Sequence, residues 1–324
     1  MEKLLAGLRA AGEPTRLRLL ALCAHGELSV TELTQILGQS QPRVSRHLKL
    51  LVEAGLLARF REGNLVFYRI AEAGDDAHLA RTLVDLLPDS DSALNRDLSR
   101  LQQIRDKRAA IAQSYFRDNA ARWREIRTMH VAEAELERVF MEVVGQSRFS
   151  DFLDIGTGTG RILELLAGQS ERGIGIDTSA EMLTLARSYL DKAGIRNAHV
   201  RKGDMYNLPI DDDTIDLATL HLVLHYSMEP ALVIAEACRT LKPGGRLIIV
   251  DFAPHQEDSL RTEHQHERLG FAENEIVSIV ENLKCEMGQI RVLSGKPLTV
   301  NIWEAVKPHL GKSVHTKSDS AQLH

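Results

Sequence analysis

Three alternating glycines after an apolar run are the residues of this chain whose spacing points most directly to chemistry. Residues 153–160 read Leu-Asp-Ile-Gly-Thr-Gly-Thr-Gly, and the helix-forming segment Arg161–Ala167 follows. Glycines suit such a strand, loop and helix because a missing Cβ lets the backbone turn sharply and lets a ligand approach the main chain. Arg161 stands where a dinucleotide-binding loop keeps a small residue. The loop therefore predicts a nucleotide-like ligand and disfavours NAD.

Acidic residues farther along the chain extend this site. Ile174–Asp177 predicts a second short strand that ends in an acid, and this carboxylate can accept hydrogen bonds from both ribose hydroxyls of an adenosine. Asp204 and Met205 follow a third expected strand, His199–Lys202, and can contact the edge and face of an adenine. The pattern thus predicts an adenosine-containing ligand.

The order of the segments predicts an α/β fold with a parallel sheet. Strand patterns alternate with helical ones, with a fourth strand at Asp216–Leu220 and a glycine turn at Leu241–Gly245 that leads into a fifth. Ile290–Leu293 and Leu298–Val306 flank the turn Ser294–Pro297. This last pair predicts a closing antiparallel hairpin at the sheet edge, where a proline in the turn is tolerated.

Together these motifs resemble the class I S-adenosylmethionine-dependent methyltransferases over about residues 115–308. The likeness rests on Asp-x-Gly-x-Gly-x-Gly, the acid ending the second strand, Gly-Asp-x-x-x-Leu-Pro at 203–209 and Leu-Lys-Pro-Gly-Gly at 241–245. It implies a Rossmann-like domain with S-adenosyl-L-methionine as the cofactor. The cofactor-binding residues that the resemblance implies are Asp154, Gly156, Thr157, Gly158, Gly160, Asp177, Thr178, Met182, Asp204, Met205 and Leu220.

Charge separates a basic amino-terminal part from an acidic remainder. Residues 1–70 hold ten Lys or Arg and six Asp or Glu, whereas the whole chain has a net charge of −5. The first segment is therefore +4, which leaves −9 for the rest. This division suggests that the amino-terminal part alone meets a polyanion such as nucleic acid.

Composition indicates a soluble protein of two domains. The 324 residues are 44% hydrophobic and 26% charged, which is typical of globular chains. The three cysteines lack Cys-x-x-Cys spacing, and there is no leader or apolar run of about 18 residues. We expect a cytoplasmic protein with no membrane partner and a flexible tail at 309–324.

The amino-terminal segment, 1–73, has the pattern of a helix-turn-helix with a wing. Ser29 can cap a helix that runs through Leu37, with Glu32 completing a capping box, and a second helix is expected at Gln41–Ala54. Its exposed side chains suit base edges and phosphates. The hairpin that follows carries arginines on one arm. The predicted DNA-binding residues are Gln41, Arg43, Ser45, Arg46, Lys49, Arg59 and Arg61.

The stretch Pro14–Ile70 resembles the ArsR family of winged-helix repressors. The likeness rests on Gly12–Leu17, Gly26–Leu28, Gln41–Leu48 and Glu53–Leu57. It implies a homodimer on a palindromic site in double-stranded DNA. A winged helix used only for protein contacts is the competing interpretation, against which the arginines at the reading positions count.

Metal sensing, which occurs among ArsR proteins, is disfavoured by the residues at the family's ligand positions. Hydroxyls at Ser29 and Thr31 stand where the arsenic and cadmium sensors carry thiols. His78 lies in a matching Asp-Ala-His, but the partner positions hold Asp89 and Ser92 instead of a histidine and an acid. We therefore expect no metal site.

Residues 74–114 are expected to form dimerisation and linker helices. An apolar stripe spaced by threes and fours predicts an amphipathic helix from Ser92 to Ile111 that can pair with its twin or lie on its own domain. Because the ArsR repressors that this segment resembles act as dimers, pairing of the helix with its copy in a second chain is favoured. The stripe consists of Leu94, Leu98, Leu101, Ile104 and Ile111, and the preceding helix offers Leu79, Leu83, Leu86 and Leu87.

Two histidines after the fourth strand are the candidate catalytic residues. If His221 and His225 lie on one helical turn, they share a face, and either imidazole can accept a proton from the methyl acceptor near neutral pH. Methyl transfer from a sulfonium mainly needs alignment and exclusion of water, so a base is optional. The alternative is that one histidine orients the acceptor and the other packs against the sheet.

Three other groups of side chains invite interpretation. The aromatic residues Tyr115, Phe116 and Trp123, with Arg124, suit a lid over the cofactor or packing between domains. His264 and His266 point to opposite sides if both are helical, so a cap on the substrate side is preferred to a metal cluster. The cysteines argue against arsenite methylation, because the second and third, Cys238 and Cys285, stand far apart in the sequence.

Three functions are compatible with these features. The first is an ArsR-type transcriptional regulator fused to a methyltransferase that acts on a small molecule. The second is a pure regulator whose methyltransferase-like domain senses S-adenosylmethionine or S-adenosylhomocysteine. The third is an enzyme whose winged helix serves only dimerisation, and the polar residues of the expected recognition helix count against it.

Overall fold

The computed structural model describes residues 1–62, 65–71, 75–108, 110, 131–264 and 266–309. The chain forms two compact units, one of Met1–Ile126 with Gly156–Asp204 and the other of Arg127–Ile155 with Met205–His324. The expected lid residues Tyr115, Phe116, Trp123 and Arg124 and the tail from residue 310 lie outside the described residues.

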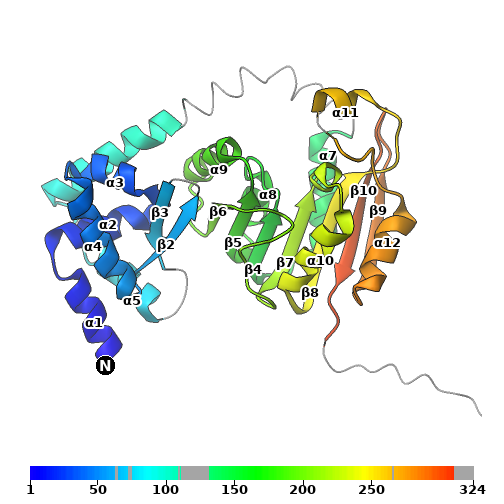
Figure 1. Cartoon of the computed structure of the whole chain (residues 1–324). Helices are drawn as coiled ribbons and strands as arrows, with labels where there is room; N and C mark the ends of the chain where they lie inside the picture. Colours follow the sequence, from blue (N-terminus) through cyan, green and yellow to red (C-terminus); the bar gives the residue numbers. More distant parts are fainter. Residues whose placement is uncertain (63–64, 72–74, 109, 111–130, 265, 310–324) are drawn as a thin grey trace, which may run out of the picture. The chain divides into compact units, whose positions relative to one another are not determined.

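The first unit begins with a helix-turn-helix followed by a two-stranded wing, as the sequence predicts (Figure 1). Its elements are α1 (Glu2–Ala11), α2 (Pro14–Ala24), β1 (Leu28–Ser29), α3 (Val30–Leu37), α4 (Gln41–Glu53), β2 (Leu57–Glu62), β3 (Leu65–Ile70) and α5 (Asp75–Asp85). The three strands form an antiparallel sheet in the order β1-β3-β2.

Local sequence explains where α3 begins and ends. The Ser29 side chain accepts a hydrogen bond from the backbone N–H of Glu32, and the Glu32 carboxylate accepts one from the Ser29 backbone. This reciprocal capping satisfies two of the N–H groups that a helix start leaves without partners. Gly38 ends the helix with φ of 64°, a conformation that glycine adopts at little cost. The predicted capping box is confirmed.

The helix at 92–108 packs on its own amino-terminal domain. Leu101 and Ile104 are buried in the core formed by α2, α3 and α4. Asp97 is 1% exposed and accepts two hydrogen bonds from the Arg18 guanidinium, at 2.6 and 2.8 Å. The expectation that this whole stripe pairs with a second copy is therefore wrong for Leu101 and Ile104, while Leu98 stays exposed.

The remainder of the first unit is α8 (Arg161–Leu166), β5 (Ser170–Asp177), α9 (Ala180–Lys192) and β6 (Ala198–Lys202). The two strands pair in parallel, which confirms the strand and helix alternation expected after the glycine loop. Gly160 allows close packing here, because a Cβ at this position would lie 3.2 Å from the Cβ of Ala186 on α9.

The second unit supplies the other strands of the large sheet. Its elements are α7 (Glu133–Val144), β4 (Phe149–Ile155), β7 (Ile215–His221), the short 3-10 helix η1 (Leu224–Tyr226), α10 (Pro230–Thr240), β8 (Leu241–Phe252), α11 (Ser259–His264), α12 (Glu273–Asn282), β9 (Glu286–Leu293) and β10 (Val300–Val306). The strand order of the seven-stranded sheet is β6-β5-β4-β7-β8-β10-β9. This is the predicted Rossmann-like sheet: successive strands are added on one side from β4 to β6 and on the other side from β7 on, so the topological switch point lies between the parallel strands β4 and β7.

The carboxy-terminal edge of the sheet is the predicted hairpin. Strand β10 runs antiparallel to both β8 and β9, and β9 is the edge strand. The turn expected at Leu241–Gly245 lies inside β8 as an irregularity, where the register shifts and Gly244 has φ of 83°. Such a bulge lets one strand bend without leaving the sheet.

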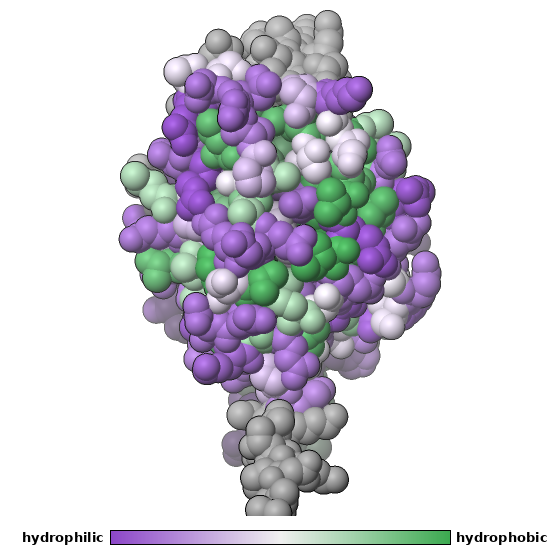
Figure 2. Space-filling model, turned by 90° about the vertical axis from the view of Figure 1, so that its right-hand side faces the viewer, coloured by the Kyte–Doolittle hydropathy of each residue, from purple (hydrophilic) through white to green (hydrophobic). Residues whose placement is uncertain are grey.

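The face that carries this edge is chemically mixed. Apolar side chains form separate groups among polar ones on it (Figure 2). None of the helices in the described residues is both long enough and apolar enough to cross a bilayer.

Candidate functional site

The glycine loop of the first unit is held by hydrogen bonds to the end of β5. The backbone N–H groups of Gly156 and Thr157 both donate to the carbonyl of Ile176, at 2.8 and 2.9 Å. Gly158 donates to the Asp177 carboxylate at 2.9 Å. All three glycines of the loop have positive φ, 72°, 52° and 80° in chain order, which explains why side chains are absent there.

These bonds decide which ligands suit the loop. Its N–H groups at 156, 157, 158 and 160 are used within the protein, so they do not form the open set of donors that binds phosphate. A Cβ built on Gly158 would have no described atom within 4 Å, so the loop faces open space. The buried hydroxyl of Thr157 has no hydrogen-bond partner within the described residues. The loop fits a ligand without phosphate, such as S-adenosylmethionine, better than a dinucleotide.

Asp177 connects the loop with the start of α9. One carboxylate oxygen accepts from Gly158 and the other from the backbone N–H of Ser179, at 2.8 Å. The Ser179 hydroxyl in turn caps α9 through the N–H of Met182 at 3.2 Å. A carboxylate oxygen can accept more than one hydrogen bond, so Asp177 keeps capacity for two ribose hydroxyls. Thr178, which lies between the acid and the cap, is exposed.

The predicted adenine residues follow directly after β6. Gly203 donates its N–H to the Asp177 carbonyl at 3.0 Å, which ties the end of β6 to the end of β5. Asp204 comes next and is exposed, whereas Met205 begins a segment of the second unit.

Asp154 is buried at the carboxyl end of β4, in the second unit. It is 1% exposed, and the hydroxyl of Thr219 on β7 donates to its carboxylate at 2.7 Å. Asp154 pairs in register with Thr219, and Ile155 pairs with Leu220. These residues therefore stand at the switch point between β4 and β7, where ligands bind in open α/β sheets. The sequence did not single out Thr219.

The two candidate catalytic histidines do not share a helical turn, so the condition for a shared helix face is not met. His221 ends β7, whereas His225 lies in η1. Leu222 between them has φ of 52°, which turns the chain sharply. The His221 ring meets Phe140 edge to face, with centroids 5.7 Å apart.

His225 belongs to a buried group that the sequence did not reveal. Its Nδ1 lies 2.9 Å from one carboxylate oxygen of Asp251, and its backbone N–H donates to the other at 3.1 Å. The His266 ring stacks on the His225 ring, with centroids 4.0 Å apart. Both rings are almost fully buried. Asp251 follows the apolar run Ile248–Val250 near the end of β8, and an acid in this position is the sequence signal that could have identified it.

Two expectations about histidines and cysteines are corrected by the structure. His264 ends α11 and His266 lies beyond it, so they do not occupy one helix. Cys238 and Cys285, which are 47 residues apart in the sequence, bring their sulfur atoms within 3.6 Å. Both thiols are buried; Cys238 lies on α10, and Cys285 lies between α12, which contacts α10, and β9.

The predicted DNA-binding residues mostly lie on exposed surfaces of the first unit. On α4, Gln41, Arg43, Arg46 and Lys49 are exposed and Ser45 is half-buried. Their side chains leave the helix opposite Val44, Leu48 and Leu51, which are fully buried. On the wing strand β2, Arg59 and Arg61 are exposed.

Two family descriptions match separate parts of the chain. Residues 13–59 match the description "Bacterial regulatory protein, arsR family". Residues 148–305 match the description "Methyltransferase domain". The first match covers the helix-turn-helix, and the second covers the large sheet from the start of β4 nearly to the end of β10.

Two curated relatives are similar over about a third of the chain. An uncharacterized 37.1 kDa protein in a transposon of Streptomyces fradiae is 42% identical over 100 residues, which is 30% of this chain and 28% of that protein. An arsenite methyltransferase of Aquipseudomonas alcaligenes is 36% identical over 109 residues, which is 31% of this chain and 32% of that protein. The chain thus spans less than a third of the length of each of these two relatives.

Solved structures include the YcgJ protein from Bacillus subtilis. This similar structure is 18% identical in sequence, and the match covers 54% of this chain and 99% of the YcgJ chain with a TM-score of 0.48.

The buried histidines predict that acid destabilises the fold. Burial lowers the pKa of His266 to about 3, and His225 acts in the same direction. In the unfolded chain this histidine titrates near 6.5, so between pH 6.5 and 3 the unfolded state binds a proton that the folded state does not. We expect the free energy of unfolding to fall by about 1–2 kcal/mol between pH 7 and pH 5 from this group.

Urea denaturation at both pH values measures this effect in the wild type, in His266→Phe and in His78→Gln. Phenylalanine retains the ring stacking, so His266→Phe should lose part of the pH dependence. His78 is exposed, so His78→Gln should leave the pH dependence of the free energy of unfolding unchanged. An identical pH dependence in wild type and His266→Phe would contradict the prediction.

Proposed function

We propose that this chain, which joins a helix-turn-helix domain of the bacterial regulatory protein arsR family to a methyltransferase domain, is a DNA-binding transcriptional regulator that also methylates a small molecule. The observation that carries the enzymatic half is the glycine loop, whose conformation is fixed by Asp177 and whose N–H groups are already bonded. Such a loop suits a cofactor without phosphate.

S-adenosylmethionine is the proposed cofactor, and it would supply an activated methyl group on a sulfonium. Asp177 would accept from the ribose hydroxyls, and Asp204 and Met205 would contact the adenine. Asp154 would face the positively charged methionine part, and its bond from Thr219 supports this role by fixing the carboxylate. Thr178, Met182 and Leu220 complete the proposed set with Gly156, Thr157, Gly158 and Gly160.

The methyl acceptor is proposed to lie beyond the end of β7. Transfer is an in-line displacement, so the main task of the protein is to align the acceptor and exclude water. His221 is half-exposed and is the better candidate to accept a proton. His225 is 3% exposed and bonded to Asp251, so we propose that it positions the segment instead. Similarity to an arsenite methyltransferase covers 31% of this chain and does not by itself identify the acceptor.

The regulatory half is proposed to act as a homodimer on palindromic double-stranded DNA, in the cytoplasm. The exposed residues of α4 would enter the major groove, and Arg59 and Arg61 of the wing would contact the flanking backbone. Exposed leucines on α1 and after α5 support a dimer, because the apolar surface that they leave exposed in a single chain could be buried against a second copy. These are Leu4, Leu5, Leu8 and Leu86.

Replacing Asp177 tests the cofactor site. We expect the wild type to bind S-adenosylmethionine with a dissociation constant in the micromolar range, about −8 kcal/mol, and Asp177→Ala to weaken it about 100-fold, because the variant loses the ribose acceptor and frees Gly158 and Ser179. Isothermal titration calorimetry measures both values. Asp211→Ala, which removes an exposed acid outside the site, is the control. Unchanged affinity in Asp177→Ala would refute the assignment.

Replacing Arg46 tests the DNA surface. We expect Arg46→Ala to weaken binding to a palindromic promoter fragment by about tenfold or more, as the loss of one base or phosphate contact does. Its affinity for S-adenosylmethionine should stay the same. A gel shift at fixed salt compares it with Arg96→Ala, an exposed arginine on the helix at 92–108. Equal DNA binding by Arg46→Ala and the wild type would remove Arg46 from the surface.

The second candidate function is a regulator that senses S-adenosylmethionine or S-adenosylhomocysteine. A specific observation favours it: the winged helix, the glycine loop and α9 belong to one compact unit. We expect DNA affinity to differ at least fivefold between the two cofactor forms, which corresponds to a coupling of about 1 kcal/mol. DNA titrations with each form measure it. Equal affinities would favour independent functions for the two domains.

A further inference from the structure

The first unit contains a cavity that the proposed function does not use. Its volume is about 550 Å³, within the range of small-molecule sites. The winged helix contributes residues from α2, β3 and α5 to its lining, and α9 with the segment after it contributes the other side. None of the proposed cofactor-binding residues lines it.

Positive charge exceeds negative charge in the described lining of this cavity. Six arginines line it, against four carboxylates, which leaves two positive charges in excess. The arginines are Arg69, Arg81, Arg108, Arg172, Arg187 and Arg196, and the acids are Glu27, Asp85, Glu171 and Asp191. A planar guanidinium binds carboxylate or phosphate through two parallel hydrogen bonds, so a group of arginines is suited to an oxyanion.

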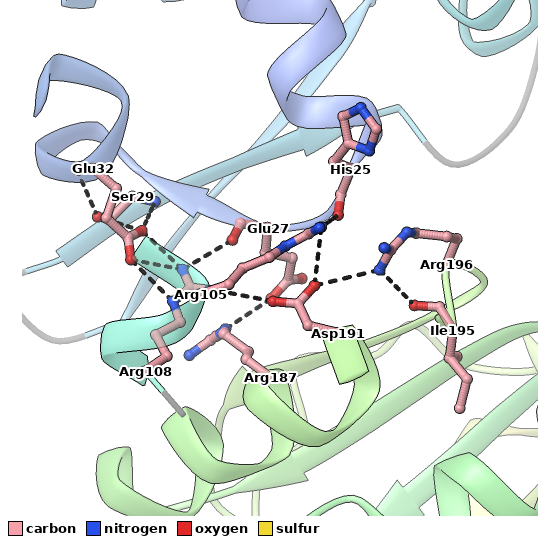
Figure 3. A network of polar contacts seen from close by, with 10 residues as sticks. All are labelled: His25, Glu27, Ser29, Glu32, Arg105, Arg108, Arg187, Asp191, Ile195 and Arg196. Carbon is pink, nitrogen blue, oxygen red and sulfur yellow. Dashed lines mark hydrogen bonds and ion pairs between the residues drawn. The ribbon is translucent and has the colours of Figure 1, made fainter. Parts of the chain in front are cut away.

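Glu27 is the first centre of the charge network on the cavity wall (Figure 3). Its two carboxylate oxygens lie 3.1 Å from Arg187 Nε and 3.3 Å from Arg69 Nη1. Its carbonyl accepts a further bond from Arg108 at 3.1 Å. All three arginine side chains are at most 11% exposed. One carboxylate thus serves two buried guanidinium groups.

Asp191 is the second centre, on α9. Its carboxylate lies 3.3 Å from both Arg105 and Arg196 and 3.7 Å from Arg108, and the close-up shows these groups converging on it (Figure 3). Arg108 has a second acidic partner in Glu32, which caps α3. Here too the cations outnumber the acids.

Burial makes this excess of positive charge unfavourable. It lowers the pKa of Arg69 to about 9, and the nearby Arg201 acts in the same direction, against the opposing effect of Glu27. Burial also lowers the pKa of His199, another residue of the lining, well below its ordinary value, with Arg69 as the next cause. An anion in the cavity would offset the desolvation of these cations.

We propose that this cavity is a binding site for a small molecule that carries phosphate or carboxylate groups and about two negative charges. The ligand would contact the winged helix through Arg69 and Arg81 and the other wall through Arg187 and Arg196. Because it touches both walls at once, it would stabilise the first unit as a whole. The proposal does not depend on methyl transfer.

Titration of the full chain with inorganic pyrophosphate and, separately, with citrate tests this site. Both titrations are done at constant ionic strength and with saturating S-adenosylhomocysteine, and thermal unfolding and calorimetry are the readouts. We expect at least one of the two to bind saturably and to raise the unfolding temperature. Pyrophosphate alone would identify a phosphate ligand, citrate alone a carboxylate, and both together a general oxyanion site.

The double variant Arg81→Gln, Arg196→Gln is the specific test. It removes one cation from each wall, and both residues are exposed enough to be replaced without loss of folding, which circular dichroism checks. We expect its affinity for the anion to fall at least tenfold. Arg138→Gln on α7 and Arg46→Ala on α4 are matched controls and should bind as the wild type does. No saturable binding of either anion, equal binding by the double variant, or loss of binding in Arg46→Ala would overturn the proposal.

Discussion

The carboxylate of Asp177 is the constraint on which the first unit depends. It accepts one hydrogen bond from the glycine loop and one from the start of α9, and its backbone carbonyl accepts a third from the end of β6. Three segments, the loop, the start of α9 and the residue after β6, are thereby joined to one residue, in addition to the bonds of Gly156 and Thr157 to Ile176 and the pairing of β5 with β6. Charge-assisted hydrogen bonds to backbone N–H groups are among the stronger ones in proteins, so one acid can hold a loop that has little side-chain packing of its own. The glycines Gly156, Gly158 and Gly160 then give the loop its curvature.

Helix α9, which begins beside Asp177, also contacts the winged helix. From its start beside Asp177, α9 runs to Arg187 and Asp191, which contact Glu27 and the arginines of the helix at 92–108. Glu32 takes part through Arg108 while it caps α3, the first helix of the helix-turn-helix. Helix α9, with polar contacts at both of its ends, therefore joins the loop that suits the cofactor with the helix that precedes the recognition helix. Buried ion pairs of this kind are weak evidence for stability, whereas the loss of one partner leaves an uncompensated buried charge and is costly.

Much of this molecule follows from local sequence. The capping residues Ser29 and Glu32, the glycine loop, and the hairpin of β2 and β3 depend on interactions over a few residues, so the local sequence predicts them. The acid at the end of β5 is predicted for the same reason. The family matches at 13–59 and 148–305 agree with the two resemblances that these motifs carry.

Other features depend on contacts between distant segments, and here the sequence misled or was silent. His221 and His225 are four residues apart, yet Leu222 turns the chain and separates them into a strand end and a short helix. Cys238 and Cys285 are far apart in sequence and adjacent in space. The sequence by itself determined the two domain types and the cofactor loop, because those rest on local backbone preferences and hydrogen bonds. Only the tertiary structure decided the partners of His225 and the arginine-lined cavity, because burial and charge pairing arise when distant elements pack.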